Sequence, residues 1–386
     1  MIRRPLGLVL GLVLGLVLGL GLGLGLDPGL GLDPGLGLDP APVAADSVPG
    51  IESAIAIRAA DLEAHVRALC DPVLEGRGAG TAGEAAARAY VVERFETAGL
   101  EPKGDGGTFE QPFDFAGEQW FLVASAPEPR YRVGKVAGRS ANAIGRIPGR
   151  DARLAAEVVV IGAHLDALGR DPDGRIYPGA DDDASGIAVL LELARVLPAA
   201  KQRPRRSIVL AAFGAEEPAP SLFGSRHYAA HPPVPLERTI AMINIDMVGR
   251  GEFLDQPELS AAKKGVGLKT RGCVGLLHRS PAVGGAARAA CKRVGLETLA
   301  VDDVPDVLRP YIERQVSGRG DFAPFEERGV PYVFFSTSES ADYHRPTDLP
   351  DTLDYANLRR IAAAICLTAY ALADADAPPP RLEGGK

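Results

Sequence analysis

The sequence predicts a three-layer α/β/α sandwich around a central mixed, largely parallel sheet. Two observations carry this prediction. Short continuous apolar runs, typical of strands buried on both faces, occur at residues 157–163, 207–213, 240–246 and 331–336. Segments with helical spacing alternate with these runs, and strands that alternate with helices indicate a parallel sheet with a helical layer on each side.

The helices are predicted from the spacing of apolar residues and from their end signals. Leu62, Val66 and Leu69 share one face of a helix over residues 59–70. Thr81 stands three residues before Glu84, a capping-box signature for the start of a helix over residues 82–98. Further helices are expected over residues 185–197, 221–230, 282–294 and 355–373, whereas residues 250–320 are Gly-rich and irregular.

Composition excludes one class of partner. The chain has 386 residues, of which 46% are hydrophobic and 24% charged, as in an ordinary globular enzyme. Its net charge is -8, and few basic groups cluster to neutralise phosphates. We therefore expect no nucleic-acid partner.

The N-terminus has the pattern of a targeting signal. Arg3 and Arg4 precede an apolar Gly/Leu/Val tract of 21 residues, from Leu6 to Leu26, as in a signal peptide. A tract of this length also spans a bilayer, so residues 1–45 are expected to be a signal peptide or a low-complexity Gly/Leu membrane anchor. The alternative is a low-complexity expansion with no targeting role. We expect export to the periplasm or the extracellular space, one folded domain over residues 51–373, and a disordered tail over residues 374–386.

The four cysteines form no CxxC pair, which argues against a thiolate metal site. In an exported protein, Cys273 and Cys291 are candidates for a disulfide. Cys70 and Cys366 lie in apolar helical patterns and are expected to be buried thiols.

Chemically capable residues follow the predicted strands. His164 stands directly after the first strand, with Asp166 two residues on, where it is close enough to accept a hydrogen bond from the imidazole. Glu216 and Glu217 follow the second strand, so that one side chain can bind a metal while its neighbour serves as a base. Ligands of an open α/β sheet gather at the carboxyl ends of its strands.

Three further motifs add acidic and imidazole groups. Asp182 is the middle residue of an Asp run that leads into an apolar helix, Asp246 ends the third strand, and His344 lies in a polar loop after the fourth. Each motif alone has a non-functional explanation, such as a solvated acidic loop, a helix cap or a surface imidazole. Together the five motifs supply two His and three carboxylates, the set needed by two zinc ions that share one carboxylate.

With these motifs the sequence resembles the co-catalytic di-zinc aminopeptidase family, which includes bacterial leucyl aminopeptidases, aminopeptidase Y and glutamate carboxypeptidase. The resemblance rests on LEGRGAGTAGE, GAHLD, GADDDASG, FGAEE, NIDM and YHRPTD in this order. It implies a zinc exopeptidase-like fold and two Zn²⁺. By motif, His164 and Asp246 would hold one ion, Glu217 and His344 the other, and Asp182 would bridge them.

The resemblance also implies catalytic roles. Glu216 would be the base for a water shared by the two metals, Tyr343 would help to stabilise the oxyanion, and Asp166 would orient His164. Arg319 and Asp321 stand where the family has an Arg-Ser-Asp-His/Tyr segment. Here the segment reads Arg319-Gly-Asp-Phe, so the resemblance assigns neither residue a role.

The function implied is hydrolysis of N-terminal residues from peptides with a free N-terminus, with membrane association if the N-terminal tract is retained. Three other functions fit the same motifs. A carboxypeptidase needs a cation for the substrate carboxylate, for which Arg319 and Arg345 are candidates. A glutaminyl cyclase uses a related scaffold with one zinc, and a binding module on this fold would have no activity.

Overall fold

The computed structural model describes residues 50–124, 130–253, 270–300 and 318–383, together with Asp255 and Asp303. The N-terminal segment 1–45, predicted to be a signal peptide or an anchor, lies outside the described residues. Among the described residues, no helix is both long enough and apolar enough to cross a membrane.

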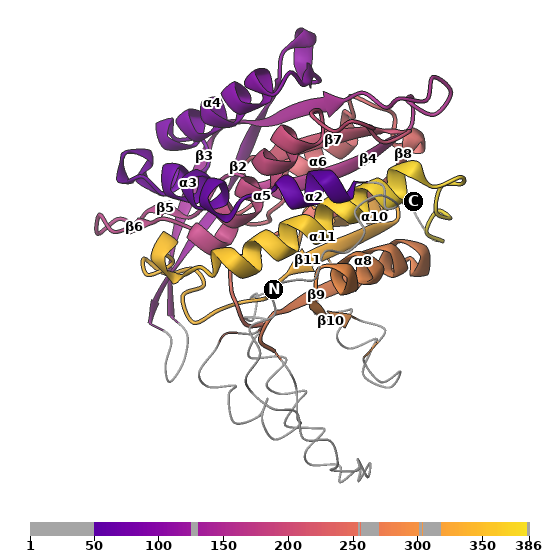
Figure 1. The fold of residues 1–386 in the computed structure, drawn as a ribbon. Helices are drawn as coiled ribbons and strands as arrows, with labels where there is room; N and C mark the ends of the chain where they lie inside the picture. Colours follow the sequence, from indigo (N-terminus) through magenta and orange to yellow (C-terminus); the bar gives the residue numbers. More distant parts are fainter. Residues whose placement is uncertain are drawn as a thin grey trace, which may run out of the picture.

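A mixed sheet forms the middle of the molecule, and its four central strands are parallel (Figure 1). The strand order is β1 (Glu101–Pro102), β3 (Arg130–Ile147), β7 (Ser207–Phe213), β4 (Val158–His164), β8 (Thr239–Ile245), β11 (Tyr332–Ser336), β9 (Cys273–His278) and β10 (Glu297–Ala300), and β2 (Glu110–Ala124) pairs with β3. The predicted mixed, largely parallel sheet is confirmed, with antiparallel strands added at both sides.

Helices cover both faces of the sheet, which confirms the three layers. The larger helical layer contains α2 (Ile51–Ala56), α3 (Ala59–Leu69), α4 (Ala82–Thr97), α5 (Ser185–Val196), α8 (Pro281–Arg293) and α11 (Tyr355–Asp374). The other layer contains α6 (Phe223–Ala230) and α10 (Ala323–Glu326). Strand β4 shows why its sequence is continuously apolar: Val159 and Ile161 pack into the first layer and Val158 and Val160 into the second.

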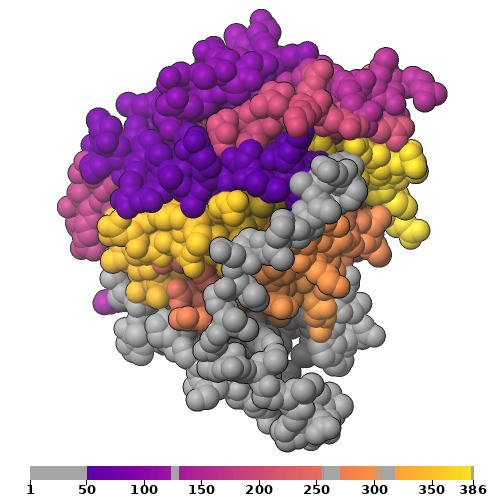
Figure 2. Space-filling view, in the orientation of Figure 1, coloured from indigo at the N-terminus to yellow at the C-terminus, as the bar shows by residue number. Residues whose placement is uncertain are grey.

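The first and the last helices of the described chain meet on one face. Figure 2 shows the indigo N-terminal helices directly against the yellow helix α11. The Arg359 guanidinium of α11 donates to the carbonyl of Ile57, 2.9 Å away, between α2 and α3. One cluster of buried apolar side chains accordingly runs from Ala54 to Ala373.

Residues 374–386 are not disordered where the structure describes them, contrary to the sequence prediction. The Arg381 guanidinium donates to the carbonyls of Leu236, Thr239 and Arg328 at 2.8, 3.1 and 2.7 Å. The Leu382 side chain packs against the apolar cluster beneath α6 and α10. The prediction failed because it rested on Pro and Gly content. The hydrogen bonds of Arg381 to main-chain carbonyls and the packing of Leu382 are enough to hold the segment in place.

The long hairpin of β2 and β3 was not predicted. Residues 130–139 of β3 are largely exposed, whereas residues 140–147 are almost all buried between β1, β2 and β7. No single apolar period therefore runs through the strand. The candidate disulfide between Cys273 and Cys291 is not formed. All four cysteines are free thiols, with Cys70 half-buried and the others buried.

Gly162 in the middle of β4 provides a test of the packing that leads to His164. A Cβ at Gly162 would collide with the buried Phe213 ring and lie 2.9 Å from Met242 Cε. We expect Gly162→Ala to lower the free energy of unfolding by about 1–3 kcal/mol through overpacking. Denaturant titration measures this change.

The matched control is Gly285→Ala on the exposed face of α8, where an added Cβ meets nothing within 4 Å. It should raise stability by up to about 1 kcal/mol, because alanine favours a helix over glycine. Equal stability of Gly162→Ala and the wild type would contradict the tight packing of β4.

Candidate metal centre

The predicted site residues meet at the carboxyl edge of the central strands. His164 is the last residue of β4, Asp246 directly follows β8, and Glu216 and Glu217 follow β7 by three and four positions. The register pairs His164 with Phe213, so that β4 and β7 end at the same level. Asp182 comes from the turn η3 (Ala180–Ala184) before α5, and His344 from the loop between β11 and α11.

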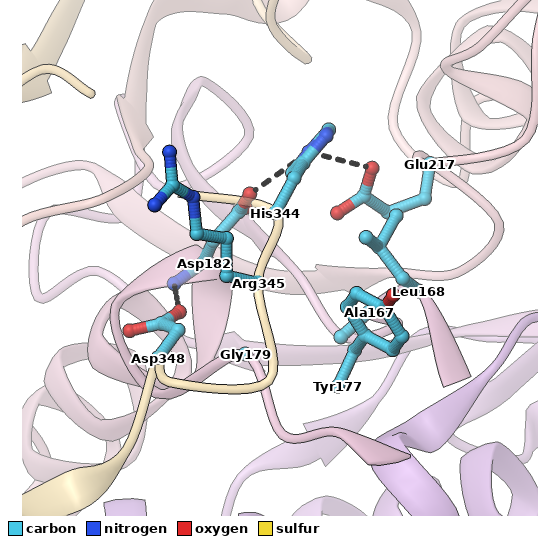
Figure 3. Close-up of a pocket in the computed structure, with 9 residues that line it drawn as sticks. All are labelled: Ala167, Leu168, Tyr177, Gly179, Asp182, Glu217, His344, Arg345 and Asp348. Carbon is cyan, nitrogen blue, oxygen red and sulfur yellow. Dashed lines mark hydrogen bonds and ion pairs between the residues drawn. The ribbon is translucent and has the colours of Figure 1, made fainter. Parts of the chain in front are cut away.

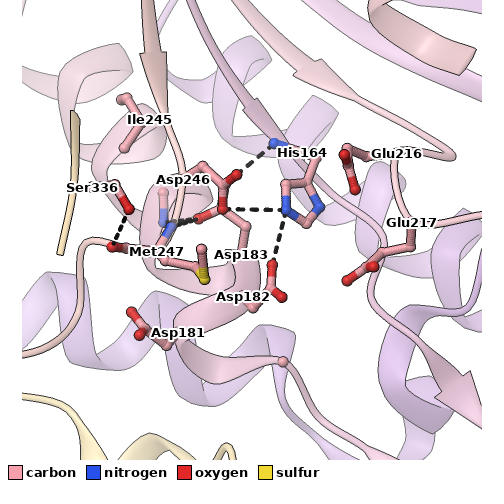
Figure 4. Close-up of polar contacts among 12 residues, drawn as sticks. His164, Asp181, Asp182, Asp183, Glu216, Glu217, Ile245, Asp246, Met247 and Ser336 are labelled. Atoms are coloured by element: carbon pink, nitrogen blue, oxygen red, sulfur yellow. Dashed lines mark hydrogen bonds and ion pairs between the residues drawn. The ribbon is translucent and has the colours of Figure 1, made fainter. Parts of the chain in front are cut away.

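Asp182 stands at the centre of the cluster, and each of its carboxylate oxygens faces a different histidine. Oδ1 is 3.0 Å from His164 Nε2, and Oδ2 is 3.2 Å from His344 Nε2 (Figure 4 for His164, Figure 3 for His344). Glu217 Oε2 is 3.3 Å from His344 Nε2, and Asp246 Oδ1 is 3.6 Å from His164 Nε2. All five side chains predicted as ligands are thus brought together.

The donor atoms form two groups that share Asp182. One contains His164, Asp182 and Asp246, and the other contains Asp182, Glu217 and His344; within each group the candidate ligand atoms lie within 4.8 Å of one another. Asp246 Oδ1 is buried and accepts no hydrogen bond. A buried carboxylate oxygen in that state is costly, and a cation between it and the imidazole fits the donor set.

The candidate ligands shift one another's pKa. Burial favours a lower pKa for His164 and His344, but the facing carboxylates raise both well above the usual 6.5. Burial favours a higher pKa for Asp182, but its hydrogen bonds to both imidazoles lower it overall. Burial raises the pKa of Asp246. Metal binding displaces such protons, because ligating imidazoles and carboxylates must be deprotonated.

The Asp run separates its three side chains into different tasks. Asp183 points to the main chain, where it accepts from the amides of His164, Gly186 and Met247 at 3.2, 2.9 and 3.2 Å. Asp181 accepts from the Gly249 amide at 2.7 Å and from Arg250 at 3.3 Å. Only Asp182 enters the cluster, and the peptide bond that follows it is cis.

The carboxylate of Asp348 binds the main chain of the turn that carries Asp182. Its oxygens accept from the amides of Asp181 and Asp182 at 3.0–3.1 Å, and the Arg250 guanidinium pairs with it at 3.2 Å. The sequence prediction assigned no role to Asp348 or Arg250. Asp348 ends the motif YHRPTD, which was its only signal, and Arg250 has no local signal because its partners are distant in sequence.

The predicted role of Asp166 is wrong in detail. The atom next to His164 Nδ1 is the main-chain carbonyl oxygen of Asp166, at 3.1 Å, whereas the carboxylate is 4.0 Å away. The carboxylate instead accepts from the amides of Glu216 and Glu217 at 2.9 and 3.1 Å. Burial raises its pKa to about 8. Asp166 therefore fixes both Glu main chains, and its carbonyl selects the His164 tautomer with a proton on Nδ1.

Glu216 and Tyr343 lie beside the cluster. Glu216 is buried next to His164 and Glu217 (Figure 4). The Tyr343 ring stacks on the His344 ring, with centroids 3.8 Å apart. Burial and the nearby Glu339 raise the pKa of Tyr343 well above its usual value, so its hydroxyl keeps its proton.

Arg319 and Asp321 also reach this region. Arg319 Nη2 is 3.3 Å from Glu339 Oε1. Asp321 is buried, and burial, more than the neighbouring His164, determines its pKa of about 6. The substituted segment therefore still brings both charged groups to the site.

Left-handed backbone occurs at three positions of the site. Ala215, Met247 and His344 have φ of 51°, 53° and 56°. Ala215 precedes Glu216, Met247 follows Asp246, and His344 is itself part of the cluster. Non-glycine residues adopt this conformation at a cost that surrounding structure must offset, and such positions concentrate at functional sites.

A small, open pocket lies beside the cluster (Figure 3). Asp182, Glu217 and His344 form its polar end, and the remaining lining residues are Ala167, Leu168, Tyr177, Gly179, Arg345 and Asp348. The pocket thus places an apolar wall next to the candidate ligands.

Residues 142–369 match the sequence profile of peptidase family M28. The chain belongs to this family. The matched range covers more than half of the chain and contains every candidate ligand, so the match and the geometry concern the same residues.

The relatives of this M28 chain include proteins named as a zinc metalloprotease and as an aminopeptidase. A probable zinc metalloprotease from Pyrenophora tritici-repentis is 31% identical over 241 residues, which cover 56% of this chain and 54% of the relative. Aminopeptidase YwaD from Bacillus subtilis is 28% identical over 222 residues, which cover 55% and 41%. The chain thus spans about half the length of the curated relatives that it matches.

The fold is shared with solved structures. An aminopeptidase from Aneurinibacillus sp. strain AM-1 superposes with a TM-score of 0.61 at 19% sequence identity, over 86% of this M28 chain and 97% of the other. At that identity the likeness concerns the fold.

Asp166 offers a test of how the M28 site is supported. Asp166→Asn leaves one acceptor oxygen for two amides, so that either Glu216 or Glu217 loses its main-chain partner. We expect turnover to fall by about 10–100-fold, the usual effect of removing a group that orients metal ligands. Steady-state kinetics on a peptide substrate measures the change.

Asp171→Asn is the matched control. Asp171 is also buried, but a single oxygen, Oδ1, accepts from the amides of Asp173 and Arg175, and asparagine retains one such oxygen. Its Oδ2 accepts from the Tyr177 hydroxyl at 3.4 Å, and the asparagine amide can donate to that hydroxyl instead. Its turnover should remain near that of the wild type. An equal loss in both variants would contradict the specific role of Asp166.

Proposed function

We propose that this M28 protein is a zinc aminopeptidase that binds two zinc ions and removes N-terminal residues from peptides. The observation that carries the proposal is the position of Asp182, whose two oxygens face two separate imidazole–carboxylate pairs. Imidazole nitrogens with carboxylate oxygens are typical zinc ligands, and three protein ligands per ion leave positions open. His164 and Asp246 would hold one ion, Glu217 and His344 the other, with Asp182 shared.

The metals, when bound, polarise the scissile carbonyl and lower the pKa of water. The remaining chemistry falls to the protein. Glu216, whose main chain is fixed by Asp166, accepts the proton of the attacking water and returns it to the leaving amine. Tyr343, which keeps its proton, donates a hydrogen bond to the developing oxyanion.

The site favours a substrate with a free amino terminus. Asp321 and Glu339 add negative charge near the cluster beyond its three ligand carboxylates, so a protonated amine is attracted even with metals bound. Arg319, one of two candidate cations for a carboxypeptidase, is already paired with Glu339. The apolar residues Ala167, Leu168 and Tyr177 line the open pocket next to the cluster, which favours an uncharged substrate side chain there over a charged one.

Substrate and metal assays test the proposal together. A panel of aminoacyl-nitroanilides and of free and N-acetylated peptides should show cleavage of unblocked substrates only, and chelator should abolish it. Metal analysis should find two zinc ions per chain. One ion and cyclisation of N-terminal glutamine would identify a glutaminyl cyclase, and cleavage from the carboxyl end would identify a carboxypeptidase.

Glu216→Gln separates metal binding from catalysis. The amide cannot accept the proton of the attacking water, so we expect turnover to fall by about 10²–10⁴-fold while bound zinc is unchanged. The exposed Glu237→Gln is the control and should behave as wild type. Near-normal turnover of Glu216→Gln would remove this residue from the role of base.

Removal of zinc should destabilise the fold. A ligand that binds only the native state stabilises it by about 4 kcal/mol when present at about 1,000 times its dissociation constant. We therefore expect chelation to lower the thermal midpoint and added zinc to restore it. Asp182→Asn, which loses the shared charge, should show a smaller response to zinc than the wild type in the same calorimetric scan.

We further propose that the protein is exported, on the strength of the Arg3-Arg4 pair before the apolar tract. Cell fractionation, with N-terminal sequencing of the mature protein, distinguishes a cleaved signal from a retained anchor. Intact protein in the cytoplasm would contradict export.

A further inference from the structure

Arg77, from the segment LEGRGAGTAGE, lies beneath the candidate metal centre without joining it. Its side chain is 0% exposed, which is unusual for a cation. The residue ends the turn η1 (Pro72–Arg77), and its carbonyl accepts from the Ala167 amide at 3.3 Å. The next residue, Gly78, forms a β-bridge with Ala167. The segment therefore runs along the chain that leaves β4 after His164.

All three guanidinium nitrogens donate to main-chain carbonyls. Nε is 2.9 Å from the Leu165 oxygen, Nη1 is 2.7 Å from both the Leu69 and Pro178 oxygens, and Nη2 is 2.9 Å from the Gly179 oxygen. Cys70 Sγ is a more distant acceptor at 3.9 Å. In the described part of the chain, the guanidinium has no carboxylate partner. Its contacts thus serve the position of the main chain and not the pairing of charges.

Three of these carbonyls, those of Leu165, Pro178 and Gly179, belong to the two segments that present His164 and Asp182, and the fourth, that of Leu69, ends α3. Leu165 directly follows His164, and Gly179 starts the turn that presents Asp182. Gly179 has φ of 60°, and a Cβ there would lie 3.1 Å from Arg77 Nη2, so the turn lies close against the guanidinium.

The turn before α5 is therefore held on two kinds of group. Arg77 binds the carbonyls of Pro178 and Gly179, and the Asp348 carboxylate binds the amides of Asp181 and Asp182. The same guanidinium binds the carbonyl after His164. One planar side chain thereby sets the separation between the main chains of His164 and Asp182, whose side chains meet at 3.0 Å.

We propose that Arg77 is a positioning residue that determines the zinc affinity of the centre by fixing these two main-chain segments relative to each other. The inference rests on the proposed function. Lysine cannot replace it, because one ammonium has three donors at a single point, whereas the guanidinium distributes five donors in a plane. Loss of a group that orients metal ligands usually weakens metal affinity by about 10–100-fold.

Arg206 provides the matched control, because it too is a fully buried arginine that donates to main-chain carbonyls. It binds the carbonyls of Ala373 and Ala375 and pairs with Glu157 at 2.6 Å. It stands directly before Ser207, the first residue of β7, and therefore at the opposite end of the strand from Glu216 and Glu217. A lysine there disturbs a comparable network far from the metal centre.

The experiment compares wild type, Arg77→Lys and Arg206→Lys as full-length proteins. Zinc affinity is measured by competition with a chelating dye, the free energy of unfolding is measured on the metal-free proteins, and kcat and KM are measured with zinc present. We expect both variants to lose stability. Only Arg77→Lys should bind zinc about 10–100-fold more weakly, with kcat reduced more than KM is changed.

Several outcomes overturn the inference. Zinc binding by Arg77→Lys as tight as by the wild type removes the positioning role, and an equal loss of affinity in Arg206→Lys reduces it to general stability. A wild-type protein that binds no zinc overturns the proposed function and this inference together, whereas normal wild-type binding with an unaffected Arg77→Lys overturns the inference alone.

If Arg77→Lys does not fold, Arg77→Gly replaces it. The native φ of 50° at this position suits glycine, and the substitution leaves a cavity shaped for a guanidinium group. Millimolar guanidinium ion should restore zinc affinity, whereas ammonium ion at the same concentration should not. Failure of guanidinium to restore affinity in the folded variant would overturn the proposal.

Discussion

The crowding of buried carboxylates at one edge of the sheet is the constraint on which the rest of the structure depends. Asp166, Asp181, Asp182, Asp183, Asp246 and Asp348 are each at most 8% exposed. Carboxyl groups buried in such proximity are tolerated only when each is protonated, paired with a cation or hydrogen-bonded to fixed dipoles. Main-chain amides serve Asp166 and Asp183, and Arg250 serves Asp181 and Asp348. Asp182 and Asp246 have imidazoles as their principal partners, so the negative charge is concentrated where cations can bind.

This arrangement explains why so many supporting contacts end on main-chain atoms. A ligand side chain has few rotatable bonds, so its donor atom is placed largely by its own backbone. Asp183 links the end of β4 to the start of α5, and Asp166 links the chain after β4 to the chain after β7. Arg77 links the chain after β4 to the residues that precede the Asp182 turn. The left-handed residues Ala215, Met247 and His344 fit the same scheme, because each re-aims the chain at a strand end or loop.

Membership in peptidase family M28 agrees with this view of the site. The match over residues 142–369 begins within β3 and ends within α11, and therefore contains all the parallel strands. Arg77 lies before that range, yet its guanidinium contacts Leu165, next to His164, and Gly179, before the Asp182 turn. The turn that carries Arg77 in this sense supports the site, because its guanidinium binds the main chain beside two candidate ligands.

The sequence by itself determined the central strands, most of the helices and the five candidate ligands. It did so because buried parallel strands are continuously apolar and because reactive side chains at their carboxyl ends must meet at one edge. The tertiary structure alone decided what supports those ligands. The hairpin of β2 and β3 has no single period, the Asp166 carboxylate binds amides 50 residues away instead of the nearby imidazole, and Asp348, Arg250 and Arg77 find partners only after folding. Hydrogen bonds between residues distant in sequence leave no local pattern, because the sequence around a polar residue does not specify which distant group its side chain will bind.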